Sequence, residues 1–215
     1  MPEDKKVNKI NYQLELNDKL LQIEKSGARP RLLLHACCAP CSSYVLEYLS
    51  EYFDITVYFY NPNIYPEDEY AFRSEELRRL VREMPLKGKA NVVVTDYISD
   101  EFYNLAKGRE DIPEGGERCR ICYRLRLERA AEYAARNGYD YFTTTLTISP
   151  YKNSAWLNEM GAELSKVYGV EYLFSDFKKR NGYKRSCELS EQYGLYRQNY
   201  CGCEYSKRAP DDLKL

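Results

Sequence analysis

The sequence is poor in histidine, in net charge and in long apolar runs, and each shortage excludes a class of protein. His35 is the only histidine in 215 residues, so a soft-metal site must consist almost entirely of thiolates. No window approaches the roughly 18 consecutive apolar residues that a membrane-spanning helix needs, so no membrane partner is expected. Lysine and arginine number 32 against 33 aspartates and glutamates. Any nucleic-acid surface must therefore be local.

What the sequence has in abundance is clustered cysteine. Seven of the eight cysteines form three groups, Cys37-Cys38-x-x-Cys41, Cys119-x-x-Cys122 and Cys201-x-Cys203. Cysteines that serve only as small buried hydrophobes would be scattered at apolar positions, as Cys187 is. Disulfide frameworks are typical of short secreted domains, and the charged start of this chain is not followed by an apolar signal segment. We therefore expect reduced thiols without disulfides, a cytoplasmic protein and a metal site.

The number of clustered cysteines narrows the kind of metal site. All-thiolate ligation selects iron-sulfur clusters, zinc or copper(I). A structural zinc ion would use four thiolates, and seven exceed that number. The count favours a four-cysteine iron-sulfur cluster and a second metal held by the other three cysteines.

Apolar runs alternate with amphipathic segments along most of the chain. Strands are predicted at 31–35, 55–60, 90–95, 141–146 and 170–174, and helices at 7–26, 41–52, 67–83, 118–137 and 153–168. This alternation predicts an α/β fold with a doubly wound, Rossmann-like parallel sheet. We divide the chain into an N-terminal helical appendage (1–30), a main domain (31–205) that ends in a C-terminal extension (176–205), and a tail (206–215).

The predicted fold places the cysteines where such sheets bind ligands, at the carboxyl ends of the strands. The first group follows the first strand directly, and Cys119 and Cys122 would share one face of the first turn of the long helix. Helix N-termini stabilise thiolates through their exposed amides and dipole. Gly202 permits an unusual turn between Cys201 and Cys203, so that the two can point at neighbouring metals.

Four motifs give the chain a resemblance to a known family. They are His35-Ala-Cys-Cys-Ala-Pro-Cys41, Cys119-x-x-Cys122-Tyr-x-x-Arg126, Thr144-Thr-Leu-Thr-Ile-Ser149-Pro-Tyr-Lys152-Asn153 and Gly194-Leu-Tyr-Arg-Gln-Asn-Tyr-Cys-Gly-Cys203. In this order and spacing they resemble the cobalamin-independent epoxyqueuosine reductase family over roughly residues 31–205.

The resemblance implies an oxidoreductase of tRNA modification that reduces epoxyqueuosine to queuosine at the wobble position. Its substrates would be the tRNAs with GUN anticodons, those for tyrosine, histidine, aspartate and asparagine. The family is taken to hold a 4Fe-4S cluster beside a single iron ion, without cobalamin, on a fold related to adenine-nucleotide alpha hydrolases and PP-loop enzymes. An external donor such as ferredoxin or flavodoxin would supply electrons.

The resemblance also suggests how the cysteines divide between the two metals. One of Cys37 and Cys38, with Cys38 preferred, would join three cysteines on the cluster: Cys119, Cys122 and Cys201. The other would hold the single iron together with Cys41 and Cys203. Some family members carry a carboxylate at the position of Cys41, which bears on the third ligand of this iron.

Several other residues have both a functional and a structural interpretation. His35 would donate a proton to the substrate, or would only bond the backbone at a strand end. Lys152 and Asn153 would contact the substrate or a tRNA phosphate, whereas Asn153 alternatively caps the next helix. Aromatic and cationic side chains near the last cysteines would stack on and bind a flipped-out base, or form an ordinary basic surface: Tyr183, Arg185, Tyr196 and Arg197.

Two other function classes are compatible with parts of this pattern. A PP-loop-type tRNA thiolation enzyme would share the fold, but its first loop should contain glycines that cradle pyrophosphate, and residues 37–41 contain none. A non-catalytic RNA-binding module with structural zinc would need only four of the thiolates. The thiolation enzyme could also hold an iron-sulfur cluster, so metal content distinguishes an enzyme from the module: iron and sulfide at about four per chain favour an enzyme, and zinc alone favours the module.

Overall fold

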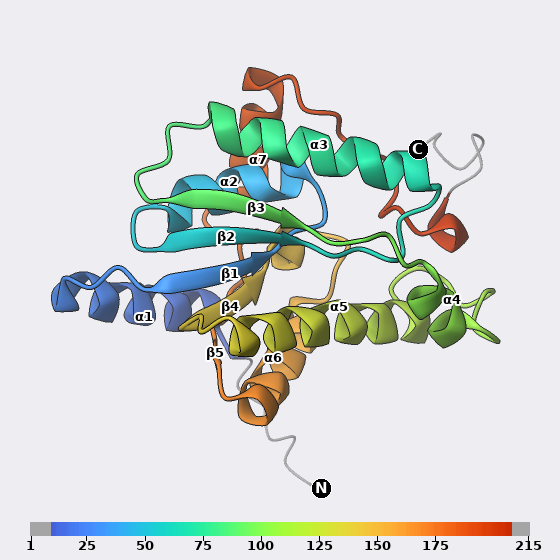
Figure 1. The fold of residues 1–215 in the computed structure, drawn as a ribbon, viewed down its shortest axis with the longest axis horizontal. Coiled ribbons are helices and arrows are strands. Elements are labelled where there is room, and N and C mark those ends of the chain that lie inside the picture. Colours follow the sequence, from blue (N-terminus) through green and yellow to red (C-terminus); the bar gives the residue numbers. More distant parts are fainter. Residues whose placement is uncertain (1–9, 208–215) are drawn as a thin grey trace, which may run out of the picture.

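The chain folds around a five-stranded, all-parallel sheet with helices on both faces (Figure 1). This computed structural model describes residues 10–207. The strands are β1 (Arg31–His35), β2 (Asp54–Phe59), β3 (Ala90–Val94), β4 (Tyr141–Thr144) and β5 (Glu171–Tyr172). Their order, β3-β2-β1-β4-β5, confirms the predicted doubly wound α/β fold.

The helices largely follow the predicted ranges. They are α1 (Tyr12–Ser26), α2 (Ala39–Leu49), α3 (Glu67–Glu83), α4 (Asp100–Ala106), α5 (Glu117–Arg136), α6 (Ser154–Tyr168) and α7 (Gly182–Gln192), with short 3-10 turns at Thr145–Ile148 and Glu204–Ser206. Helix α4 was not predicted, because it buries only Phe102 and Ala106 and so shows little apolar periodicity. The last residues of the predicted fourth strand form the first 3-10 turn instead.

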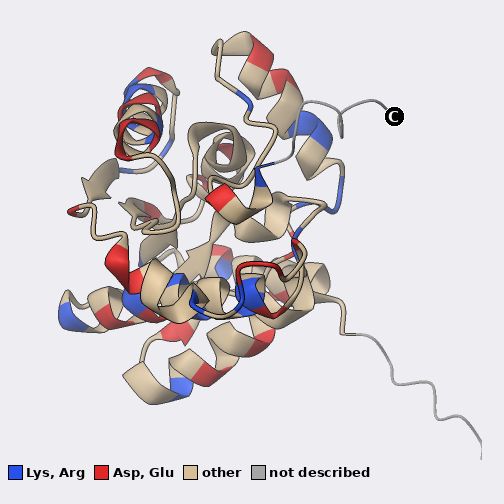
Figure 2. Ribbon diagram, turned by 90° about the vertical axis from the view of Figure 1, so that its right-hand side faces the viewer, with Lys and Arg blue, Asp and Glu red and all other residues tan. Residues whose placement is uncertain are grey.

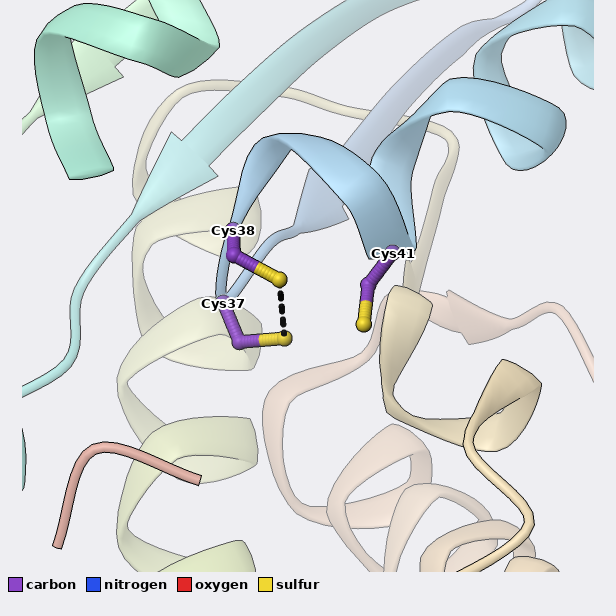
Figure 3. A group of neighbouring side chains, drawn as sticks. All are labelled: Cys37, Cys38 and Cys41. Atoms are coloured by element: carbon purple, nitrogen blue, oxygen red, sulfur yellow. Dashed lines mark hydrogen bonds between the residues drawn. The ribbon is translucent and has the colours of Figure 1, made fainter. Parts of the chain in front are cut away.

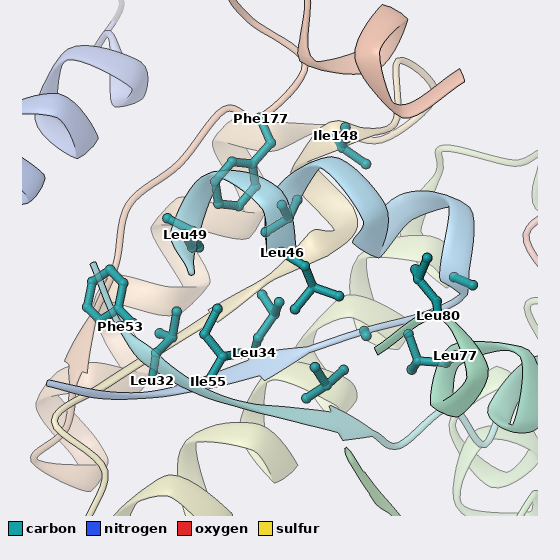
Figure 4. Packing of buried hydrophobic residues seen from close by; sticks show 14 of the residues in the cluster. Leu32, Leu34, Leu46, Leu49, Phe53, Ile55, Leu77, Leu80, Ile148 and Phe177 are labelled. Carbon is teal, nitrogen blue, oxygen red and sulfur yellow. The ribbon is translucent and has the colours of Figure 1, made fainter. Parts of the chain in front are cut away.

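Side chains of β1 alternate between two hydrophobic clusters, one on each face of the sheet. Leu32 and Leu34 face the cluster that Figure 4 shows, and Leu33 faces the other. Helices α2 and α3 cover the first face with four leucines: Leu46, Leu49, Leu77 and Leu80. Helices α5 and α6 cover the second face, with Leu127, Leu157 and Leu164. A strand covered on both faces is apolar throughout, which explains the uninterrupted leucines of β1.

Helix α1 is packed into the main domain, whereas the sequence predicted an appendage. Leu16, Leu20 and Ile23 are buried in the same cluster as Leu32. Tyr12 stacks on Phe174 with ring centroids 5.9 Å apart, next to the short edge strand β5. The helix therefore adds to the layer on the first face of the sheet, near β5.

The sheet reverses its strand order between β1 and β4, and this point positions the functional site. From β1 the chain continues outward to β2 and β3, whereas β4 and β5 lie on the other side. His35 and Thr144, the last residues of β1 and β4, pair in register. Figure 2 looks onto this carboxyl edge, where acidic and basic segments are interspersed on the surrounding helices. No helix in residues 10–207 is long and apolar enough to cross a bilayer.

Candidate metal centre and substrate cavity

The first cysteine group forms a compact set of three thiols. Cys37 and Cys38 occupy the turn after β1, and Cys41 lies in the first turn of α2, which Pro40 helps to start. The three sulfurs lie within 4.8 Å of one another, and the Sγ atoms of Cys37 and Cys38 are 3.7 Å apart (Figure 3). Soft donors at this spacing fit a thiophilic metal ion.

The other four clustered cysteines come from α5 and the C-terminal segment. Cys122 and Cys203 are buried in one small hydrophobic cluster, and Cys201 packs against it. Cys119, one turn before Cys122, is half-buried, and its Sγ accepts a hydrogen bond from the Gly115 amide at 3.3 Å. Because Cys201 also lines the same cavity as Cys37, Cys38 and Cys41, it connects the two thiol groups.

All eight cysteines are free thiols. The hydrogen bond from Cys38 lowers the pKa of Cys37 well below its usual value, and the same contact raises the pKa of Cys38. In the second group, Cys203 lowers the pKa of Cys201, while burial raises the pKa of Cys122 to about 11. In each of these two sets, one thiol therefore loses its proton readily and the other thiols keep theirs. All thiols of a set ionise only when a cation is bound.

The segment that carries Cys201 and Cys203 is fastened to the turn after β2. The carbonyl of Gly202 accepts a hydrogen bond from the Tyr65 amide at 2.9 Å. Gly202 has φ +103°, and a Cβ atom there would lie 2.9 Å from Ile64 and 3.1 Å from the Arg73 guanidinium. Only glycine fits both the backbone conformation and the space. This turn therefore sets the positions of both thiols.

Replacing Gly202 with alanine should reduce metal binding by more than twofold and leave the fold intact. The backbone conformation alone costs on the order of 1–3 kcal/mol for a residue with a side chain. Gly169→Ala is the matched control, because Gly169 also has a positive φ of +72° but no neighbour within 4 Å, and it ends α6 outside the cavity lining. Metal content per folded chain is the measurement. Equal metal content in the two variants would contradict the assigned role of this turn.

A cavity of about 300 Å³ opens beside the thiols. Its lining includes three residues predicted to bind substrate or RNA, Lys152, Tyr183 and Arg197. It also includes Tyr151, whose side chain is 70% exposed and which the sequence analysis did not single out. Burial alone would lower the pKa of Lys152, but the thiolates of Cys37, Cys201 and Cys41 raise it. The cavity thus joins soft ligands, three cationic side chains (Arg73, Lys152 and Arg197) and aromatic rings near its mouth.

Two buried arginines, of which Arg73 also lines the cavity, bind the segments around the cysteines, and neither was predicted from the sequence. Arg73 pairs with Glu69 at 2.6 Å, and its Nη1 donates to the Cys201 carbonyl at 3.4 Å. Arg118 donates to the Tyr205 carbonyl at 3.3 Å and to three carbonyls of the preceding loop, those of Arg109, Glu110 and Ile112. Neither residue stands out in a sequence in which arginine normally marks the surface.

Two predicted site residues, His35 and Asn153, are engaged in structural contacts. His35 is fully buried, its Nε2 lies 3.1 Å from the Tyr60 carbonyl and its Nδ1 lies 2.9 Å from the Thr144 hydroxyl. Burial lowers the pKa of His35 to about 3, so the ring is neutral. The Asn153 side chain caps α6 by accepting from the Ala155 and Trp156 amides. We therefore propose neither a proton-donor role for His35 nor a substrate contact for Asn153.

Arg185 and Tyr196 lie outside the residues that line the cavity. Arg185 forms a two-contact ion pair with Glu47, at 2.7 and 3.0 Å. The ring of Tyr196 packs edge-on against Phe72, and both rings are about half exposed. Cys187 is half-buried and also lies outside the lining. The predicted set thus separates into residues at the cavity and residues on the surrounding surface.

Comparisons with known proteins point to one family. The profile of the family described as "Epoxyqueuosine reductase QueH" matches residues 32–209. A protein of that name from Streptococcus pyogenes serotype M1 is 48% identical over 202 residues, which are 93% of this chain and 79% of the relative. One from Staphylococcus epidermidis is 45% identical over 94% of this chain and 86% of its own length, and one from Thermotoga maritima is 37% identical over 81% and 89%.

Proposed function

The chain belongs to the epoxyqueuosine reductase QueH family, and from this we propose that it reduces epoxyqueuosine to queuosine at the wobble position of tRNA. The observation that carries the proposal is the gathering of cysteines around a cavity at the switch point of the sheet. Ligands of doubly wound folds bind at this place. The substrate tRNAs would be those with GUN anticodons, and the reaction would take place in the cytoplasm.

The reaction requires electrons, protons and a group that pulls on oxygen. Both carbon-oxygen bonds of the epoxide break, a carbon-carbon double bond forms, and the oxygen leaves as water after taking up two electrons and two protons. A four-cysteine cluster beside one iron ion would supply single electrons and a Lewis acid for that oxygen. The donor set fits these metals, because it offers seven free, clustered thiols and no imidazole that is open to a metal. No cobalamin is required.

We propose that Cys38, Cys119, Cys122 and Cys201 hold the cluster and that Cys37, Cys41 and Cys203 hold the single iron. Neighbouring thiols at 37 and 38, and again at 201 and 203, would each serve two adjacent metals. A simpler division assigns the compact set of Cys37, Cys38 and Cys41 to the single metal and the other four to the cluster. Variants at Cys38 and Cys203 separate the two divisions.

The cavity walls would bind the flipped-out nucleoside. Tyr151 and Tyr183 present rings that can stack on an unpaired base, and Arg197 lies over the Tyr183 ring at 5.4 Å. Lys152, which also lines the cavity, would contact the substrate oxygen or a phosphate. Electrons would come from an external carrier such as ferredoxin or flavodoxin.

Conversion of modified tRNA is the direct test. Iron-loaded protein, kept without oxygen and supplied with a low-potential reductant and tRNA carrying epoxyqueuosine, should yield queuosine without added cobalamin or ATP. Mass spectrometry of the digested tRNA measures the product. A zinc-loaded sample is the control and should give none, since zinc cannot transfer electrons. Absence of product from the iron-loaded protein, while a known reductase converts the same tRNA in parallel, would refute the proposed function.

A further inference from the structure

Arg126 is a buried cation that the proposed reaction leaves without a role. It lies on α5 one turn after Cys122, and its side chain is 3% exposed. The Nε atom donates to the Cys122 carbonyl at 3.3 Å, and Nη1 approaches the Asn61 Oδ1 atom at 3.4 Å. Asn61 in turn donates to the Ala36 carbonyl at 2.8 Å, immediately before Cys37. The guanidinium thus lies between the two segments that carry these cysteines.

The polar partners of Arg126 are few for a buried guanidinium, which has five N–H donors. Arg73 is equally buried but pairs with the carboxylate of Glu69, and Arg118 has four carbonyl partners. Within residues 10–207, Arg126 forms no ion pair with a carboxylate. A buried charge without a counter-charge is strongly unfavourable, so a negative group must be nearby.

The ionisable groups on the segments that Arg126 contacts are cysteines. The guanidinium bonds the backbone of Cys122 directly and reaches the segment of Cys37 through Asn61, so ionised ligands of a bound metal at these positions would supply the missing negative charge. Burial alone would lower the pKa of the guanidinium, whereas negative charge on Cys122, Cys37 and Cys201 raises it. An overlapping set of cysteines raises the pKa of Lys152. Lys152 lines the cavity, however, where the substrate can reach it. Arg126 is therefore the cation on the protein side of the centre, sealed from the cavity and from solvent.

We propose that Arg126 is the fixed counter-charge of the metal centre, a positioning residue that stabilises its more negative state and so raises its reduction potential. This inference rests on the proposed metal centre, not on the identity of the RNA substrate. One-electron reduction would make the net charge of the metal centre more negative by one unit, and its thiolate ligands already give it an excess of negative charge. In a buried site the nearby guanidinium offsets that charge much more effectively than it would in water.

The test compares Arg126→Met, Arg126→Lys and Arg124→Met in the iron-loaded protein. Arg124 is on the same helix but pairs with exposed Glu163 at 2.5 Å, so its variant controls for substitution type and for lost net charge. Arg126→Met should lower the one-electron reduction equilibrium constant at least tenfold, a shift of about 59 mV to more negative potential. Arg126→Lys should recover most of that shift, and Arg124→Met should show none. Redox titration followed by absorbance measures all three without tRNA.

A second measurement tests the proposal even if Arg126→Met binds less metal or is less stable. Thermal unfolding is followed for the metal-loaded and metal-free forms of each variant. A counter-charge predicts that Arg126→Met loses much more stability when metal is bound, whereas equal losses in both forms would mean a purely structural role and overturn the proposal. An unchanged potential would overturn it as well. If the wild type binds zinc and no iron, the proposed function fails separately, and the same counter-charge then predicts faster zinc loss to a chelator from Arg126→Met than from Arg124→Met.

Discussion

Replacing Cys122 with alanine is expected to abolish the iron-sulfur absorbance and bring turnover below detection. Cys122 is buried, so neither water nor a surface side chain can take its place as a ligand. The proposed division and the simpler alternative both assign Cys122 to the cluster. Removal of one of four thiolates should therefore eliminate about four irons and the matching sulfide per chain. Broad visible absorbance and iron and sulfide analysis of protein purified without oxygen are the measurements.

Cys187→Ala provides the matched control for this experiment. Cys187 is half-buried on α7 and does not line the cavity. The same substitution there should leave iron, sulfide and activity at wild-type levels. Full cluster content in Cys122→Ala would show that the ligand assignment is wrong. Loss of iron from Cys187→Ala would instead show that the eighth cysteine is not merely a packed thiol.

Cys203→Ala should separate the two metals, with activity falling by orders of magnitude while the cluster absorbance persists. Cys203 is assigned to the single iron, whose proposed task is to pull on the epoxide oxygen. Its loss should remove only the iron in excess of the cluster. Cys38→Ala, by contrast, should lose the cluster absorbance. Iron-to-sulfide ratios and single-turnover conversion of modified tRNA measure both effects.

The opposite result would support the simpler division of ligands. If Cys203→Ala loses the cluster and Cys38→Ala keeps it, then the single metal belongs to the compact set of Cys37, Cys38 and Cys41. The site and the reaction would stand, but the proposed assignment of Cys37, Cys38 and Cys203 would be wrong. Both variants remove one sulfur atom from a buried position, so cavity effects on folding should be similar.

Much of the fold was predictable because each prediction depended on local pattern. The unbroken apolar run of β1 indicated a strand buried on both faces. The helices that bury one side have apolar residues that recur at the helical period, which made them predictable. The spacing of Cys119 and Cys122 on one helix face, and the short distance from β1 to Cys41, likewise depend on neighbours in sequence. Helix α4 escaped prediction because two buried side chains are too few to make a pattern.

The sequence by itself determined the α/β class, the strand ends at which ligands bind and the all-thiolate chemistry of the centre, since these follow from residue type and short spacing. Tertiary structure alone decided that His35 bonds backbone and hydroxyl groups and that the arginines at 73, 118 and 126 are buried. It also decided which thiols lie together. Arg126 reaches Asn61 across 65 residues, and Arg73 reaches Cys201 across 128. Contacts of this range leave no periodic trace in a sequence, because they arise only when distant segments meet at the carboxyl edge of the sheet.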